Sequence, residues 1–428
     1  MRIVVFLHAL GLGGTEKAAC RWAAGLVSRG HYVRVLSMHD GPRRDYLEKI
    51  GISSQVVGPW RDTIVKALVA AAPDVIHAHA PGLPFEGDVL GQALGSLPKK
   101  IPVVQTNIFG RLENPPENTW VDFRLFISWT SCVQAARRAS MGLDSKFFRR
   151  ASVAVYPLDP DDGPRADEIA HFRSSIGLGE HDLVFGRFSR PDPNKWTNLA
   201  IRSFRKARKR HAHIKLLLRE PPPSVTNQLK RDSDQSAFII LSATSDFDEI
   251  RRTMASCDVI LHTSIMGESF GYGIAEPMNL GKPVITHSVP WVDQAQLELV
   301  RHGECGFLAS TSGTMASSIV LLAQDAELRK RLGCRGKLHI RHLADPSRSL
   351  DRLEHALSCA VRSVDSSMIS EDITSAKVAA AYLDREQFGH SFGEQSSLRL
   401  SAMELQFRSW MSGLRKRLIR AARSATSA

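Results

Sequence analysis

The sequence has no continuous apolar run that approaches the roughly 20 residues needed for a membrane-spanning helix. An apolar stretch at residues 3–10 follows a single arginine and runs into a glycine-rich turn, without a convincing signal-peptidase site. We therefore interpret residues 3–10 as a buried strand and expect a cytoplasmic protein.

Clustered cysteines are also missing. The six cysteines are scattered along the chain, with no CxxC pair and no cysteine–histidine group at zinc-ligand spacing. This pattern predicts neither a disulfide framework nor a structural metal site, and it favours a reducing compartment.

The composition is that of a globular protein with a basic surplus. The 428 residues are 43% hydrophobic and 23% charged, and this length favours two domains over one. A net charge of +12 favours acidic partners such as nucleoside diphosphates, anionic lipid or nucleic acid. No helix-turn-helix pattern and no basic motif interleaved with aromatic residues is present, so we expect no nucleic-acid partner.

Short runs rich in Val and Ile alternate with helical stretches, a pattern typical of parallel strands buried on both faces by crossover helices. A first series of strands is predicted at residues 3–7, 32–36, 75–77, 103–106 and 125–127. A second series is predicted at residues 183–185, 214–218, 238–241, 259–261, 284–286 and 307–308. A polar, proline-bearing stretch at residues 157–163 separates them and reads as the interdomain connection.

The sequence therefore predicts an α/β protein with two doubly wound, Rossmann-like domains at residues 1–160 and 161–345. Residues 346–428 are predicted to be a helical extension. Its last part, residues 400–423, has apolar and basic side chains at helical spacing, which predicts an amphipathic basic helix. Two roles remain open for this helix: packing or an oligomer contact, and docking on anionic lipid at the inner face of a membrane.

A glycine-rich turn, Gly11-Leu12-Gly13-Gly14-Thr15-Glu16, connects the first strand to a helix. Glycines at this point let backbone amides approach a phosphate at the positive end of the helix. The turn lacks the GxGxxG spacing of dinucleotide sites, and no acidic residue clearly ends the second strand to hold a ribose. A tight strand-to-helix turn without a ligand is an equally good interpretation.

A proline-stiffened basic loop runs from Arg187 to Lys195, after the first strand of the second series. Together with Arg190, these two residues place three cations where they could neutralise a leaving diphosphate as a glycosidic bond breaks. The alternative is a solvated basic loop without a ligand.

The strongest signal is the segment GESFGYGIAEPMNLGKPVI at residues 267–285. It places Glu268 in a glycine-rich turn after a strand, and Glu276 eight residues later, about two helical turns away. A carboxylate on that helix can accept paired hydrogen bonds from a ribose diol. The glycines permit close backbone approach to a sugar and a diphosphate.

This segment resembles the Glu-x7-Glu motif of the family 4 retaining glycosyltransferases of the GT-B fold, including the Gly-Lys-Pro-Val-Ile that follows. The chain resembles the same family at Gly13-Gly14-Thr15-Glu16, Ile76-His77-Ala78-His79, Gly186-Arg187 with Lys195, Cys257-Asp258-Val259 and residues 302–308. These segments cover roughly residues 1–345. The resemblance implies two facing Rossmann-like domains, with the acceptor on the first domain and the nucleotide-sugar donor on the second.

The resemblance also implies roles for the basic loop and for the two carboxylates. Arg187 and Lys195 are similar to the diphosphate-binding pair of the family, although Arg190 matches the usual spacing to the lysine better, so either arginine is a candidate. Glu276 is similar to the carboxylate that binds the ribose. Glu268 is similar to the carboxylate beside the transferred sugar.

Two backbone segments receive implied roles as well. The loop Ser269-Phe270-Gly271 would donate backbone amides to the donor. Gly13 and Gly14 would line the cleft from the side of the first domain.

The chain departs from the family at two places near the sugar. The family has a histidine after the fifth strand, where this chain reads Gln-Thr-Asn-Ile-Phe-Gly at residues 105–110, so a backbone carbonyl, Asn107 or His79 would replace its contact. His77 and His79 alternate on one strand, and we expect one to face the cleft and the other the opposite face. The loop at residues 289–293 also lacks the glycine-rich form of the family.

The implied reaction moves a sugar from a nucleotide sugar to a hydroxyl acceptor with retention of configuration. A UDP-sugar or a GDP-sugar is the favoured donor. It would use no metal and no cofactor, and it would serve polysaccharide or lipid-linked glycan synthesis. A sugar-nucleotide epimerase, a phosphorylase and a catalytically inactive GT-B-like binding protein remain alternatives on the same architecture. An epimerase would need acid–base residues at both faces of the sugar.

Overall fold

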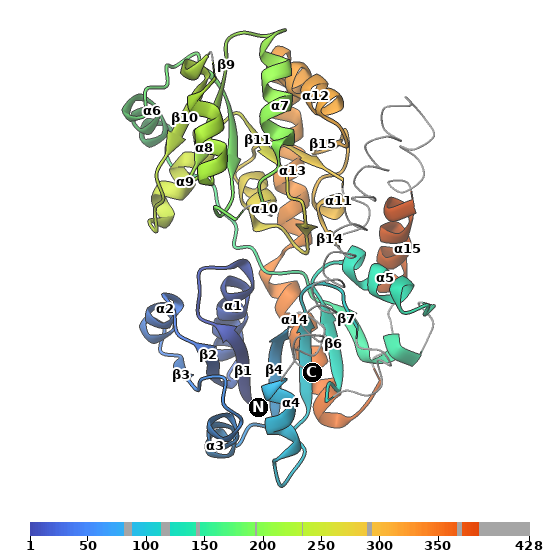
Figure 1. Ribbon diagram of the computed structural model, residues 1–428. Helices are drawn as coiled ribbons and strands as arrows, with labels where there is room; N and C mark the ends of the chain where they lie inside the picture. The colour runs from blue at the N-terminus through green and yellow to red at the C-terminus, as the bar shows by residue number, and fades with distance from the viewer. Residues whose placement is uncertain are drawn as a thin grey trace, which may run out of the picture.

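The computed structural model describes residues 1–80, 88–112, 120–142, 146–192, 195–232, 234–288, 293–365 and 370–384. These residues form two α/β domains, each built around its own parallel sheet, which are stacked end to end (Figure 1). The predicted pair of doubly wound domains is therefore confirmed.

The first domain has a seven-stranded parallel sheet in the order β3-β2-β1-β4-β5-β6-β7. Its strands are β1 (Arg2–Ala9), β2 (Tyr32–His39), β3 (Ser53–Val56), β4 (Val75–Ala80), β5 (Val103–Asn107), β6 (Phe123–Phe126) and β7 (Ala151–Val153). Its helices are α1 (Gly14–Ser28), α2 (Arg43–Lys49), α3 (Arg61–Ala71), α4 (Val89–Gly95) and α5 (Trp129–Arg138), with a 3₁₀ turn at Lys146–Arg150.

The second domain has a six-stranded sheet in the order β10-β9-β8-β11-β13-β15 and a two-stranded ribbon of β12 and β14. Its strands are β8 (Leu183–Phe188), β9 (Ile214–Arg219), β10 (Phe238–Leu241), β11 (Val259–His262), β12 (Gly267–Glu268), β13 (Val284–His287), β14 (Asp293–Gln294) and β15 (Gly306–Ala309). Its helices are α6 (Ala166–Ser175), α7 (Asn198–Arg208), α8 (Pro223–Lys230), α9 (Phe247–Ala255), α10 (Tyr272–Asn279), α11 (Gln296–Leu299), α12 (Ser312–Gln324) and α13 (Ala326–Leu343), with a 3₁₀ turn at Gln235–Ala237.

Every predicted strand overlaps a strand of the structure, because each of those segments carries an apolar run, and this run contains buried side chains in all of them except β10. The edge strands β3 and β7 were not predicted. They are short, and β3 reads Ser-Ser-Gln-Val, so neither offers an apolar run. The strand predicted at residues 125–127 begins earlier, at Phe123. The prediction missed this start because the charged Arg124, which is buried, interrupts the apolar run.

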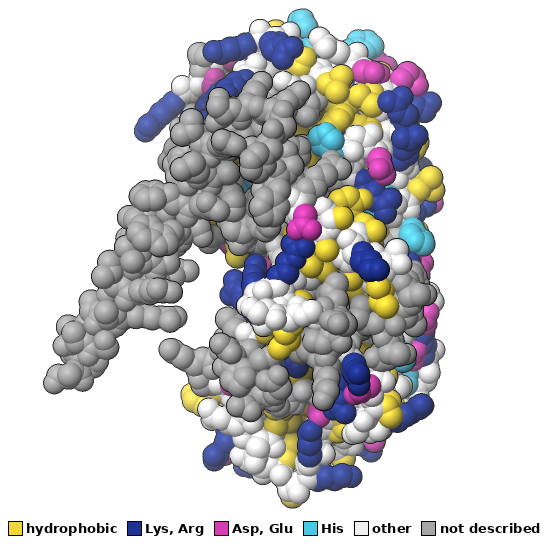
Figure 2. All heavy atoms as spheres, turned by 90° about the vertical axis from the view of Figure 1, so that its right-hand side faces the viewer, with side chains coloured by type: hydrophobic (Ala, Val, Ile, Leu, Met, Phe, Trp, Pro, Cys, Tyr) yellow, Lys and Arg dark blue, Asp and Glu magenta, His cyan; other side chains and the backbone are white. Residues whose placement is uncertain are grey.

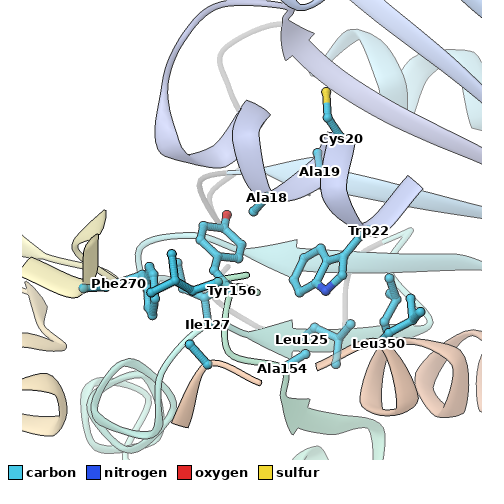
Figure 3. Packing of buried hydrophobic residues seen from close by; sticks show 14 of the residues in the cluster. Ala18, Ala19, Cys20, Trp22, Leu125, Ile127, Ala154, Tyr156, Phe270 and Leu350 are labelled. Atoms are coloured by element: carbon cyan, nitrogen blue, oxygen red, sulfur yellow. The ribbon is translucent and has the colours of Figure 1, made fainter. Parts of the chain in front are cut away.

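The chain crosses back to the first domain after α13, as Figure 1 shows. Helix α14 (Pro346–Arg362) packs beside α1, where the indole nitrogen of the buried Trp22 donates to Ser349 Oγ at 2.9 Å. Leu350 lies beside Trp22 in the same layer (Figure 3). Helix α15 (Ser370–Asp384) follows and packs on α5. The predicted basic helix at residues 400–423 lies outside the described residues.

In the described part of the chain, no helix combines the length and the apolar character needed to cross a membrane.

The contact between α1 and α14 leads to a prediction about stability. Trp22→Ala should lower the free energy of unfolding by about 3–5 kcal/mol, because it removes a fully buried indole and leaves a cavity between these helices. Urea unfolding followed by circular dichroism measures the loss. Leu338→Ala, at a side chain that is 72% exposed, should change stability by less than about 0.5 kcal/mol. Equal effects of the two substitutions would contradict this account of the core.

Candidate active site

Polar side chains gather where the central strands of the second sheet end. Arg187 on β8, His262 on β11 and His287 on β13 are all buried at the carboxyl ends of neighbouring parallel strands. In doubly wound sheets this edge is where ligands bind. The edge faces the first domain, since the Tyr272 hydroxyl of α10 donates to the Pro157 carbonyl at 3.0 Å and α10 lies above α1 in Figure 1.

Glu268 is at the centre of this cluster. Its carboxylate accepts a hydrogen bond from Lys195 Nζ at 2.9 Å and lies 3.2 Å from His262 Nε2. Burial alone would raise the pKa of Glu268, but the hydrogen bond with His262 and the charge of Lys195 hold that pKa well below its ordinary value. The carboxylate is therefore ionised at neutral pH, and it fixes the Lys195 ammonium beside the glycine-rich turn.

The backbone around Glu268 is held from both sides. β12 pairs in parallel with β14, and the Glu268 carbonyl accepts from the amide of Ala295 at 2.8 Å. Gln296 Oε1 accepts from the Glu268 amide at 3.1 Å. Gly267 and Gly271 have φ values of 65° and 101°, which favour glycine. This double support gives the carboxylate a fixed position.

Arg187 points into the second domain. Its side chain is 1% exposed, and its guanidinium donates to the carbonyls of Phe188 and Thr263, both at 2.6 Å, and of Lys195. It also lies over the Trp196 ring at 4.5 Å. Burial lowers the pKa of Arg187 to about 10, so the group is still cationic at neutral pH.

Arg190, the alternative arginine of the basic loop, is exposed. Its carbonyl accepts from the indole nitrogen of Trp196 at 2.8 Å, which anchors the loop backbone and leaves the side chain directed away from the core. The structure thus gives the two arginines different surroundings: Arg187 is enclosed among carbonyls, and Arg190 faces solvent.

Glu276 lies on α10, the helix that follows the Glu268 loop. Its ionic partner comes from the other domain. Its carboxylate forms an ion pair with Lys17 of α1. The Lys17 ammonium also lies over the Tyr272 ring, 5.0 Å from its centroid. Gly14 is close to the same ring, because a Cβ at Gly14 would lie 3.0 Å from Cδ2 of Tyr272. The glycine-rich turn of the first domain therefore faces α10.

A Cβ at Gly13 would meet the carboxylate end of the Glu16 side chain, which is flexible and could shift to make room. In the loop after β12, the Phe270 ring is buried and lies 5.8 Å from the Tyr156 ring and 4.9 Å from Tyr272 (Figure 3). This packing holds the loop that contains Ser269 and Gly271 against Tyr156, directly before the interdomain connection.

His77 and His79 lie on the same face of β4, with ring centroids 4.4 Å apart and both rings near Trp22. The expectation that they face opposite sides was wrong, because side chains two residues apart on a strand point the same way. Both are buried, and burial holds their pKa values below the ordinary range. Asn107 is buried too; its amide donates to the Arg111 carbonyl at 2.6 Å and closes the turn after β5.

Three residues of this region were not predicted. His262 had a usable signal, because it is a polar residue at the carboxyl end of a buried strand. Asp293 of β14 lies among charges from both domains, and burial raises its pKa to about 6 although Arg138 and Arg111 act in the opposite direction. Glu298 of α11 accepts from the amides of Trp129, at 3.1 Å, and Thr130 at the start of α5. Its carboxylate thus joins the domains at a helix N-terminus.

Residues 181–325 match the sequence profile of the family described as Glycosyl transferases group 1. This match confirms a resemblance to the glycosyl transferases group 1 for the segment that contains Arg187, Lys195, Glu268 and Glu276. Among curated proteins, none matches the chain.

Several solved structures have the same two-domain architecture. Anabaena HepE in complex with UDP and glucose superposes with a TM-score of 0.69 at 20% identity, covering 83% of this chain and 99% of that chain. A glycosyltransferase from Rickettsia africae gives 0.70 at 13% identity, with 84% and 98% covered. Sucrose-phosphate synthase from Thermosynechococcus elongatus gives 0.63 at 14% identity, with 85% and 100% covered. These likenesses establish the GT-B fold.

The raised pKa of Asp293 leads to a prediction about pH. Because its folded pKa of about 6 exceeds the ordinary value of 3.8, its contribution to stability is complete below about pH 4 and is lost as pH rises through 6. Asp293→Asn should therefore gain about 2 kcal/mol of unfolding free energy relative to the wild type between pH 4 and pH 7. Urea unfolding across this range measures the difference. Asp167→Asn, at an exposed carboxylate, should follow the wild type, and the same behaviour of Asp293→Asn would refute the assignment.

Proposed function

We propose that this protein is a glycosyltransferase that moves a sugar from a nucleotide sugar to a hydroxyl acceptor. The observation that carries the proposal is the fixed Lys195–Glu268 pair, with Glu276 on the adjoining helix, at the carboxyl edge of the second sheet. This edge belongs to the segment that matches the glycosyl transferases group 1 profile. A fixed ammonium, an ionised carboxylate and a second carboxylate suit the diphosphate, the sugar and the ribose of one donor molecule.

In this proposal Glu276 accepts hydrogen bonds from the ribose hydroxyls, and Lys195 binds the diphosphate. The exposure of Arg190 supports it as the second diphosphate ligand. Arg187, enclosed by carbonyls, would then position Lys195 instead of touching phosphate. Backbone amides of Ser269, Phe270 and Gly271 would donate hydrogen bonds to the donor. The Phe270 side chain would not contact it, because the ring is buried in the core.

We propose a retaining transfer that needs no metal. The bond between the anomeric carbon and the β-phosphate oxygen breaks, while the acceptor oxygen bonds to the same face of that carbon. The acceptor proton passes to the departing phosphate, whose negative charge Lys195 and Arg190 stabilise. Glu268 is held by Lys195 and His262, which favours an electrostatic role beside the sugar over attack as a nucleophile.

The donor and the acceptor are proposed from the chemistry of the site and from the solved structures with the same fold. HepE was solved with UDP, so a UDP-sugar is the first donor to test, and a GDP-sugar the second. On the face in Figure 2, Lys and Arg side chains are spread over the described surface and do not gather into one patch. We propose that a lipid-linked acceptor is approached through the basic residues 400–423, at the cytoplasmic side of a membrane.

Nucleotide binding gives the first functional prediction. UDP or GDP should raise the midpoint of thermal unfolding, because a ligand that binds only the folded state stabilises it, and EDTA should not remove the shift. Glu276→Ala should weaken this binding about 10-fold to 100-fold through the loss of two hydrogen bonds to a charged group. Glu180→Ala, at an exposed loop carboxylate, is the matched control and should bind as the wild type does. Absence of a shift with UDP, GDP and ADP would overturn the donor site.

Turnover gives the second functional prediction. Lys195→Ala should lower kcat by about 100-fold, because it removes a fixed positive charge from the leaving diphosphate. Lys206→Ala, which removes an exposed ammonium from the same domain, should leave kcat near that of the wild type. Product formation from a UDP-sugar, measured by mass spectrometry, gives both values. Nucleotide binding without turnover in the wild type would favour an inactive GT-B-like binding protein.

A further inference from the structure

The carboxylate proposed to bind ribose is paired with a side chain of the other domain. Lys17 and Glu276 lie 259 positions apart in the chain, on helices of different domains, and their charged groups are in contact. Their side chains are only 23% and 25% exposed, so the pair is largely shielded from water. The ammonium donates to Oε1 of Glu276, which is one of the two oxygens that a ribose diol would use.

The surrounding packing brings the ammonium close to this carboxylate. Lys17 lies in the first turn of α1, directly after the glycine-rich turn, and Gly14 in that turn lies against the Tyr272 ring of α10. The same ring is 5.0 Å from the Lys17 ammonium, and its hydroxyl donates to the Pro157 carbonyl of the interdomain connection. Tyr272 thus supports the lysine from one side while Glu276 pairs with it.

We propose that Lys17 competes with the donor for the ribose-binding carboxylate and that the donor must displace it. The inference rests on the proposed function, because it requires Glu276 to bind the ribose. Lys17 and the ribose diol then compete for the same carboxylate. The free energy of the Lys17–Glu276 ion pair therefore lowers the binding free energy of the donor. Lys17 is thereby a residue of the first domain that sets how tightly the second domain binds its donor.

A neutral ligand separates this competition from general attraction between charges. A nucleoside carries the ribose diol without phosphate, so removal of Lys17 can act on its binding through the freed Glu276 but not through a charge lost near the phosphates. Salt weakens the attraction within the Lys17–Glu276 pair, although less than within a fully exposed pair, and it has no charge to screen on the nucleoside. Nucleoside affinity in the wild type should therefore rise with salt concentration, which is unusual for a neutral ligand.

The test uses the full chain and three nucleosides, uridine, guanosine and adenosine, followed by ligand-observed NMR titration at low and high salt. The nucleoside that matches the stabilising diphosphate should bind about threefold to fivefold more tightly to Lys17→Met than to the wild type at low salt. The salt dependence should disappear in Lys17→Met and persist in Lys17→Arg, which keeps the charge.

Arg21→Met is the matched control. Arg21 lies one turn further along α1, pairs with Asp159 of the interdomain connection at 2.8 Å, and carries the same charge. Its removal should leave nucleoside affinity as in the wild type; a gain equal to that of Lys17→Met would mean that loosened domains, not a freed carboxylate, cause the effect. Unchanged or weaker nucleoside binding in Lys17→Met would overturn the inference while leaving the donor site intact. Failure of UDP, GDP and ADP alike to bind the wild type would instead overturn the proposed function, and this inference with it.

Discussion

The Arg187 guanidinium ties the basic loop to the carboxyl ends of the neighbouring strands β8 and β11. It donates to carbonyls at the end of β8, in the basic loop and after β11, and it is enclosed by Trp196. A buried cation of this kind is tolerated because carbonyl oxygens accept from both of its terminal nitrogens, although its Nε is buried without a hydrogen-bond partner. By holding the Lys195 backbone, it directs the ammonium toward Glu268, and His262 completes the cluster. The position of the fixed positive charge, and hence the proposed chemistry, depends on this one buried group.

The second domain meets the first through polar contacts on two short helices. On α10, Tyr272 bonds the interdomain connection and Glu276 pairs with Lys17; on α11, Glu298 accepts the first amides of α5. Helix α14 then returns the chain to the first sheet beside α1. Glu276, which would bind the ribose of the donor, is therefore also a residue of the domain contact. Donor binding and domain contact consequently share this one side chain.

Much of the architecture could be predicted from the sequence, because buried parallel strands leave apolar runs and the helix between Glu268 and Glu276 has a recognisable spacing. The short polar edges β3 and β7 leave no such run. The inward direction of Arg187 was not visible either, since it depends on carbonyls from three segments. The partner of Glu276 lies in the other domain, and no local pattern connects it with Lys17. The error at His77 and His79 was one of strand geometry, not of missing information.

The central claim is that the carboxyl edge of the second sheet holds a nucleotide sugar. A crystal structure of the full chain with the nucleoside diphosphate that stabilises it most strongly tests this claim directly. The account predicts ribose hydroxyls within hydrogen-bond distance of Glu276, a phosphate beside Lys195, and the Lys17 ammonium displaced from Glu276. A nucleotide bound elsewhere, with Lys17 and Glu276 still paired, would contradict it.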